Sequence, residues 1–312
     1  MNEAKAPAKT CLKGHKGTVL CLDTAVASPL VVSGAEDGTA RVWDLRTCKA
    51  VRMLMMPAHS DGKTEHLSAT TAASDTAVNS VTFADREDQL VAVSAGQRIG
   101  WFDLRQSSVL LKAPAHTVQY NQDEINQLVF DRANGRLASC DDAGEVQVIQ
   151  MPSRERIRTL KGKHTSICSN VQFRPRHPGH VLTGGLDCML HWWDISRSVP
   201  LCIASCSSAP IAASGSNAAQ VCNPPFVHSL HAHSSGDLLA AALGDGAVAL
   251  YSLARNSGSA GAGRARSRGR APASSLLARG GGFSLEPLVR LEGHGASAVS
   301  YTHLTLPTNR EV

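Results

Sequence analysis

The chain is 312 residues long and carries a formal net charge of +5, which is enough length for one large domain with a full core. It has no run of about 18 apolar residues, and residues 1–9 lack the apolar core of a secretory signal, so we expect neither a transmembrane span nor secretion. Nine cysteines follow no disulfide spacing, which indicates a reducing compartment, the nucleus or the cytoplasm.

One pattern recurs five times along the chain: an apolar run, a turn of small polar residues, and a short strand. Alternating Val, Ile and Phe bounded by Gly and Asp indicates strands, and a recurring period indicates a repeat architecture. The turns and the strands that follow them lie, in chain order, at residues 33–44, 94–103, 139–149, 183–194 and 243–251. The sequence therefore predicts an all-β repeat protein.

The first copy has the clearest motif, Gly14-His15 followed by Trp43-Asp44. A Gly-His pair with Trp-Asp about 25 to 30 residues later is typical of a WD-repeat β-propeller blade. In proteins of that kind, a His, a Ser or Thr, an Asp and a Trp form a hydrogen-bond relay that locks the strands of a blade. Two copies match this relay, with His15, Ser33, Asp37 and Trp43 in one and His164, Thr183, Asp187 and Trp193 in the other.

The same residue types would also suit a hydrolase triad. The set recurs in register in two repeats, however, and the chain has no Gly-x-Ser-x-Gly elbow. We therefore assign these residues to blade structure and expect no catalytic residues.

Three polar segments, 60–77, 205–221 and 255–282, interrupt the repeats, and their composition cannot bury enough apolar area to order them. The predicted organisation is a segment that can supply a ring-closing strand (1–11), propeller blades (12–253), an Arg/Gly/Ser-rich disordered linker (254–286), the start of a further repeat (287–300) and a non-native tail (301–312).

A propeller must close on itself to hide its strand edges. Five repeats and a fragment leave a gap, so we expect the natural protein to continue for one or two more blades.

Residues 123–142 and 164–175 resemble the WD repeat-containing protein 53 family, and the similarity is strongest over residues 120–200. The resemblance implies a seven-bladed propeller. It also implies association with cullin-4 ubiquitin ligases, whose WD-repeat substrate receptors often carry Trp-Asp-x-Arg at the end of a blade strand.

Two copies of that motif occur here, with Asp44 and Arg46 in the first repeat and Asp103 and Arg105 in the second, whereas Ser196 replaces the arginine in the fourth. A guanidinium offers a planar fork of donors for a partner's carboxylates or carbonyls. The alternative is that both arginines are solvated turn residues paired with their own aspartates, an interaction that contributes little to stability.

Other candidate sites are weaker. Arg264, Arg266, Arg268 and Arg270 could contact phosphate or act as an import signal, but they lack interleaved aromatics for base stacking. We expect no metal site, because no cysteine pair accompanies His228, His231 and His233, or His177 and His180. Asp141-Asp142 reads as a turn, and no phosphate-binding Gly-rich loop is present.

Together these patterns predict a non-enzymatic scaffold without a cofactor, and more specifically a substrate receptor of a cullin-4 type ubiquitin ligase. Its partners would be the ligase adaptor and an unknown substrate, and it would be a monomer within that complex, without membrane or nucleic-acid binding. The alternative is a general scaffold in a nuclear or RNA-associated assembly that uses the Arg-rich linker.

Overall fold

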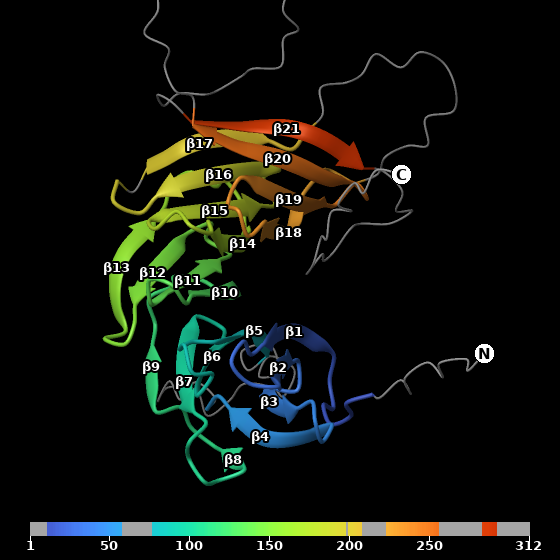
Figure 1. Cartoon of the computed structure of the whole chain (residues 1–312), viewed down its shortest axis with the longest axis vertical. Coiled ribbons are helices and arrows are strands. Elements are labelled where there is room, and N and C mark those ends of the chain that lie inside the picture. The colour runs from blue at the N-terminus through green and yellow to red at the C-terminus, as the bar shows by residue number, and fades with distance from the viewer. Residues whose placement is uncertain (1–10, 58–76, 198, 208–222, 256–282, 292–312) are drawn as a thin grey trace, which may run out of the picture. The chain divides into compact units, whose positions relative to one another are not determined.

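The computed structural model describes residues 11–57, 77–197, 199–207, 223–255 and 283–291. These residues form strands and turns without a helix, so the all-β prediction is confirmed (Figure 1). No helix among them is long and apolar enough to cross a membrane. The strands are grouped into five sheets, and the sheets have the antiparallel form of WD-repeat propeller blades.

The first sheet has the order β1-β2-β3-β4-β8 and the second the order β5-β6-β7-β9. The strands of the first are β1 (Val19–Thr24), β2 (Leu30–Ala35), β3 (Thr39–Asp44), β4 (Lys49–Met55) and β8 (Leu110–Leu111). Those of the second are β5 (Val78–Phe83), β6 (Leu90–Ala95), β7 (Arg98–Asp103) and β9 (His116–Val118).

The other three sheets each follow chain order. The third contains β10 (Ile125–Asp131), β11 (Arg136–Asp141), β12 (Val146–Gln150) and β13 (Glu155–Leu160). The fourth contains β14 (Cys168–Phe173), β15 (His180–Gly185), β16 (Met189–Asp194) and β17 (Val199–Ser205). The fifth contains β18 (Val227–Ala232), β19 (Leu238–Leu243), β20 (Val248–Arg255) and β21 (Phe283–Leu291).

Strand β21 pairs with β20 from Val248↔Leu291 to Arg255↔Phe283 and is the fourth strand of the fifth sheet. The division expected between the linker 254–286 and the further repeat 287–300 thus falls inside a strand. Much of the predicted N-terminal segment, loops, linker and tail lies outside the described residues, namely 1–10, 58–76, 208–222, 256–282 and 292–312.

The chain divides into two compact units. The first contains residues 1–137 and 151–153, and the second contains residues 138–150 and 154–312. In the first unit, a buried apolar cluster joins the first and second sheets, and it includes Val32, Val42, Val78, Phe83 and Phe102. The contact is close at Gly34 of β2, where a Cβ would lie 2.6 Å from Cys21 Sγ and would also meet Val78. Glycine therefore lets the next sheet approach the backbone here.

A buried carboxylate also ties the strands of this unit together. Asp88, in the turn before β6, accepts hydrogen bonds from the backbone N–H groups of Val26 and Ala27 in the first sheet. Arg132, which follows β10, donates to the same carboxylate at 2.6 Å, and the Asp88 side chain has no exposed surface. A buried carboxylate is stable only when such donors surround it.

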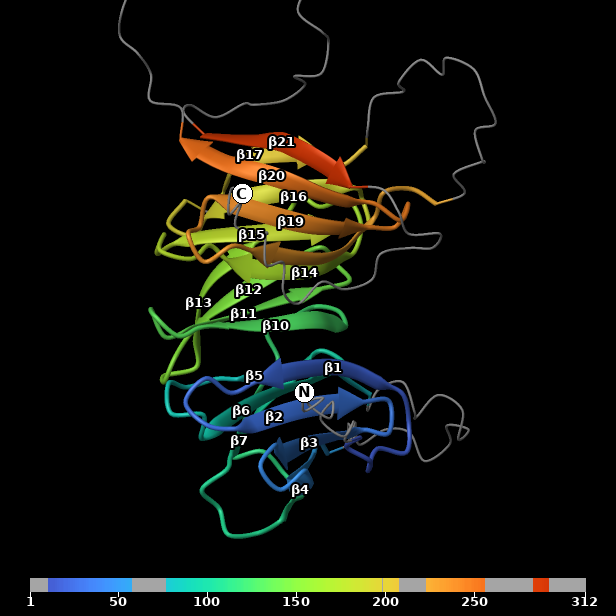
Figure 2. The same ribbon diagram turned by 45° about the vertical axis from the view of Figure 1, so that its right-hand side comes forward.

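In the second unit, the fourth and fifth sheets share one apolar cluster that includes Leu182, Trp192, Val227, Leu243 and Tyr251. Their strands, coloured yellow-green to red, lie side by side in Figure 2. Gly184, like Gly34, lets the next sheet approach the backbone, because a Cβ there would lie 3.0 Å from Val227 Cβ. The buried Arg174 donates to the carbonyl oxygens of Gly236 and Leu253, and its guanidinium lies 4.4 Å from the Trp192 ring centroid.

We predict that Asp88→Ala lowers the free energy of unfolding by about 3 kcal/mol, because it leaves Arg132 and two backbone N–H groups without their acceptor. Urea unfolding measures the loss. Glu87→Ala, at an exposed neighbouring position, is the control and should change stability by less than about 0.5 kcal/mol. Equal effects in the two variants would contradict a specific role for the Asp88 carboxylate.

Candidate functional site

The first relay joins the segment before β1 to strands β2 and β3. Trp43 Nε1–H donates to Ser33 Oγ at 2.8 Å, and Ser33 Oγ lies 2.7 Å from His15 Nε2. His15 Nδ1 lies 3.1 Å from an Asp37 carboxylate oxygen, which also accepts from the Lys16 backbone. Thr39, a member that sequence reasoning missed, donates its hydroxyl to Asp37 at 2.7 Å.

The second relay has the same geometry in the fourth sheet. Trp193 Nε1–H donates to Thr183 Oγ1 at 2.9 Å, and Thr183 Oγ1 lies 2.8 Å from His164 Nε2. His164 Nδ1 lies 3.0 Å from Asp187 Oδ2, and the Thr165 N–H donates to that oxygen. The structure thus brings together all eight residues that the sequence assigns to relays, four in each sheet.

The hydrogen-bond partners select one tautomer of the neutral histidine. Because the hydroxyl already accepts from the indole N–H, its own proton can be donated to His Nε2. The neutral imidazole then carries its proton on Nδ1 and donates it to the aspartate. Every buried polar atom of the relay is satisfied in this arrangement, which makes the blade rigid and leaves no activated nucleophile.

In the other sheets, the place of the relay tryptophan is taken by Phe102, Ile149 and Tyr251. None of these side chains carries an indole N–H, so these sheets depend on other packing. In the second sheet, Ser94 donates to the backbone carbonyl of Ser80 instead.

The two Asp-x-Arg turns lie at the C-terminal ends of strands β3 and β7. Arg46 donates through Nε and Nη2 to the Asp44 carboxylate, with Nη2 at 2.9 Å, and the Arg46 backbone N–H donates to the same group. Arg105 makes the same three bonds to Asp103, with Nη2 at 2.6 Å. These bonds lower the pKa of Asp44 and of Asp103 below its ordinary value.

Both arginine side chains are largely exposed, at 73% for Arg46 and 70% for Arg105. Arg52 of β4 donates to the carbonyl oxygens of Leu104 and Gln106, so the second turn is fastened to the first sheet. In the fourth repeat, the Ser196 hydroxyl donates to Asp194 Oδ1 at 2.6 Å, and Arg197 Nε lies 3.4 Å from the other oxygen of that carboxylate.

The histidines considered for metal binding are not gathered into one site. His231 lies in β18, while His233 follows its end and hydrogen-bonds with Ser235. His177 contacts the Pro175 carbonyl and stacks on His180. Within the parts of the chain that the structure describes, a different group, His164, Asp187 and His191, lies close together. It does not fit a metal ion, because the two imidazole rings are stacked nearly parallel, and His164 and Asp187 are already satisfied within the second relay.

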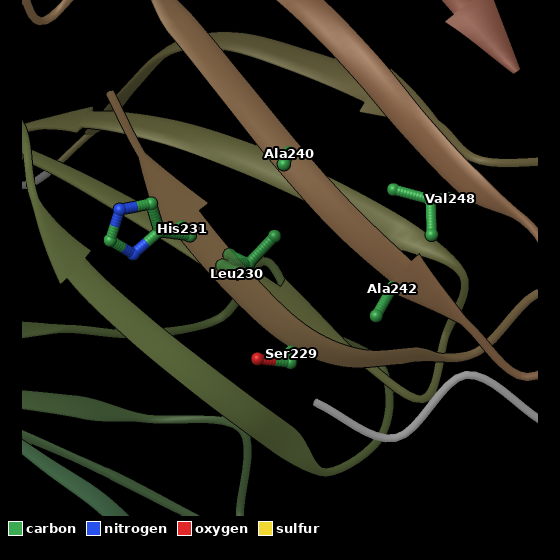
Figure 3. A pocket seen from close by; sticks show the side chains of 6 residues that line it. All are labelled: Ser229, Leu230, His231, Ala240, Ala242 and Val248. Atoms are coloured by element: carbon green, nitrogen blue, oxygen red, sulfur yellow. The ribbon is translucent and has the colours of Figure 1, made fainter. Parts of the chain in front are cut away.

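Three other features that the sequence or the surface offers as sites carry no ligand-binding geometry in the described residues. Asp141 accepts the Glu145 N–H within the turn between β11 and β12. The four arginines 264–270 lie outside the described residues. A shallow depression on the fifth sheet, lined by Ser229, Leu230, His231, Ala240, Ala242 and Val248, has no space for even a water-sized ligand (Figure 3).

Five antiparallel sheets, two of them locked by a His, Ser/Thr, Asp and Trp relay, define a WD-repeat propeller protein. Residues 6–44 match the WD40 family described as WD domain, G-beta repeat. The chain is therefore similar to WD40 repeat proteins, which are generally protein-interaction scaffolds and typically non-catalytic.

Among individual proteins, the chain is 29% identical over 255 residues to a WD repeat-containing protein 53 homolog of Dictyostelium discoideum, covering 78% of this chain and 65% of that protein. It is 42% identical over 55 residues to human THO complex subunit 6, covering 18% and 16%. It is 27% identical over 196 residues to dynein axonemal assembly factor 10 of Xenopus laevis, covering 58% and 50%. The chain therefore spans less than two thirds of each of these proteins.

We predict that Thr183→Val lowers the free energy of unfolding by about 3 kcal/mol, because His164 Nε2 and the Trp193 N–H both lose a buried partner. Thermal and urea unfolding measure the loss. Thr165→Val, at an exposed position, is the control, with an expected effect below about 0.5 kcal/mol. A neutral Thr183→Val would mean that the relay adds nothing to stability.

The first relay also predicts an acid-sensitive contribution to stability. Burial raises the pKa of Asp37, but hydrogen bonds from Thr39, the Lys16 N–H and His15 outweigh it and lower the pKa to about 2. Because this value lies below that of the unfolded chain, the carboxylate stabilises the fold above about pH 4, and about 2 kcal/mol is lost as the pH falls towards 2.

Urea unfolding at about pH 5 and at about pH 2 tests this contribution of Asp37 to stability, with Asp37→Asn as the comparison. The stability difference between wild type and variant should shrink as the pH falls. A difference that stays constant would contradict the low pKa.

Proposed function

We propose that this chain is a substrate receptor of a cullin-4 type ubiquitin ligase, and that Asp44, Arg46, Asp103 and Arg105 dock the adaptor of the ligase. The supporting observation is that two neighbouring sheets present the same turn, in which an exposed arginine is held by the aspartate two residues before it. The resemblance to the WD repeat-containing protein 53 family supports the same assignment.

Each of these arginines is held ready to bind a partner. The aspartate engages Nε and Nη2, so the Nη1 amino group can donate to a partner while the side chain keeps its position. Holding the rotamer in advance lowers the entropy that binding would otherwise cost. Because the aspartate already neutralises the guanidinium, a carbonyl oxygen suits Nη1 better than a second carboxylate does.

The spacing of the two turns is also fixed. Arg52 fastens the carbonyl groups of Leu104 and Gln106 to β4, at 3.3 Å and 3.1 Å, and the apolar cluster of the first unit joins the same two sheets. Two arginines on one rigid surface can recognise a matching pair of acceptors, and arginine is among the residues enriched at binding hot spots.

This function requires no catalytic group of the chain itself. Other subunits of the ligase would perform ubiquitin transfer, and this chain would hold a substrate close to them. The eight cysteines among the described residues form no disulfide, in keeping with a nuclear or cytoplasmic location.

Capture from cells tests the proposal. The tagged full chain should retain the cullin-4 adaptor, and the Arg46→Ala, Arg105→Ala double variant should lose it. Since exposed ion pairs contribute only about 0–1 kcal/mol, the melting temperature of the variant should be unchanged. Arg197→Ala is the matched control, because its side chain is equally exposed at 70% but lacks the two-residue spacing.

Failure of well-folded wild type to capture the adaptor would remove the ligase function. Equal loss in Arg197→Ala would mean that surface charge, and not the paired turns, holds the adaptor.

A second candidate function is a scaffold in a nuclear or RNA-associated assembly. It is favoured by the 55-residue match to THO complex subunit 6 and by the arginines of the linker 254–286. In that case the captured material should contain nucleic acid and should be released steeply as salt rises, because each phosphate contact releases a counterion. Capture of the adaptor that persists in high salt would favour the ligase.

A further inference from the structure

The fourth strand of a sheet has an outer edge, and in the first sheet this edge holds an added strand. Strand β8 pairs in parallel with β4, Met53↔Leu110 and Leu54↔Leu111, and the Met53 N–H donates to the Val109 carbonyl oxygen at 2.8 Å. The added strand comes from the connection between β7 and β9 of the second sheet. The outward backbone groups of a fourth strand can therefore bind an extended segment.

Strand β13 holds the same place in the third sheet as β4 does in the first. Arg52 pairs with Val42 in the first sheet and Arg158 pairs with Val148 in the third, each beside a shift in register. Each arginine donates to a carbonyl oxygen in the turn after the third strand of the next sheet, and the acceptor of Arg158 is Ser196 at 3.4 Å. The two strands are therefore equivalent residue by residue.

The edge of β13 is open where the edge of β4 is covered. In the second sheet, residues 104–115 join β7 to β9 and contain β8, whereas only residues 195–198 join β16 to β17 in the fourth sheet. Among the described residues, β13 accordingly pairs with β12 alone. Thr159, which the register matches to Met53, thus presents its backbone N–H at an open edge.

The other open fourth strands carry a device against strand pairing that β13 lacks. Pro200 of β17 and Pro287 of β21 occupy the position of Arg156 in β13, because each of the three residues lies beside the register shift of its sheet. Proline has no N–H to donate and blunts an edge strand. Strand β9, the fourth strand of the second sheet, has only 3 residues. Of the described fourth strands, β13 is therefore the one best suited to accept a further strand.

The surface along this edge is basic. Residues 154–163 contain five cationic side chains and one acidic side chain, in a chain whose net charge is +5. Arg156, Lys161 and Lys163 are exposed, and Ile157 has 40% of its surface exposed. The segment has no aromatic side chain on which the bases of a nucleic acid could stack. Its charge and its open backbone suit an acidic polypeptide better.

We propose that the outer edge of β13 binds an extended acidic peptide segment of a partner protein, which joins the third sheet as β8 joins the first. Backbone hydrogen bonds to β13 supply affinity, as in other cases of strand addition. Arg156, Lys161 and Lys163 attract the carboxylates of the peptide, and Ile157 contacts one of its apolar side chains. This site uses none of the residues proposed to dock the ligase adaptor, so either can fail without the other.

Fluorescence anisotropy with the full chain tests the proposal. The probe is a fluorescein-labelled peptide in which Val and Glu alternate. A comparison peptide has Pro in place of each Val, so it keeps the charge but cannot pair as a strand. We expect the probe to bind and the comparison peptide to bind at least about tenfold more weakly.

Arg156→Pro gives β13 the residue that β17 and β21 already have at this position, and it should weaken probe binding at least about tenfold. Arg156→Gln, which removes only the charge, should lose less. The double variant Lys161→Gln, Lys163→Gln should also bind the probe more weakly. The matched control is Lys49→Gln, Lys112→Gln, at two exposed positions of the edge that β8 covers, and it should bind as the wild type does.

Circular dichroism shows whether each variant is folded, and the Lys161, Lys163 double variant provides the test if Arg156→Pro is not. The proposal is overturned if folded wild type does not bind the probe, if the two peptides bind equally, or if the folded variants bind with unchanged affinity. Tighter binding of a single-stranded oligouridine RNA than of the probe would also overturn it, because the basic edge would then be a nucleic-acid surface.

Discussion

The buried indole N–H groups of Trp43 and Trp193 each donate to a hydroxyl group, and the two relays are built around these hydrogen bonds. In each, a hydroxyl accepts the indole proton, a histidine accepts the hydroxyl proton, and an aspartate accepts the histidine proton. The chain reaches that histidine before the first strand of the sheet and the aspartate in the turn between the second and third. One polar network therefore fixes the entry to the blade, its central hairpin and its third strand relative to one another.

Contacts between neighbouring sheets use backbone groups as well as side chains. Asp88 receives backbone N–H donors from the first sheet, and Arg174 donates to carbonyl oxygens of the fifth. Gly34 and Gly184 bring the facing side chain, Val78 or Val227, against the backbone itself. Apolar burial supplies most of the favourable free energy, while these polar contacts set the spacing at which the sheets meet. The exposed Asp-x-Arg turns are thus carried on a rigid support.

The fold and both relays were predictable because their residues recur at fixed spacing along the chain. The sequence offered the ion pairs Asp44–Arg46 and Asp103–Arg105 only as an alternative to partner binding by the arginines. A spacing of two residues permits such a pair but does not require it. The stacking of His191 on His164 was not predicted. His191 occupies a strand position held by Arg41 in the first repeat, and only the three-dimensional register brings it onto His164. Likewise, the pairing of β21 depends on tertiary context that its local sequence does not encode.

Strand β8 gives the first sheet its fifth strand, although it comes from the second repeat. Leu110 and Leu111 pair in parallel with Met53 and Leu54 of β4, beyond the end of β7 along the chain. In repeat arrays each module contacts only its neighbours, and the stability is approximately the sum of the modules and their interfaces. Here one module supplies backbone hydrogen bonds to the sheet of the other. Separating the first sheet from the second repeat would therefore break backbone hydrogen bonds as well as side-chain contacts.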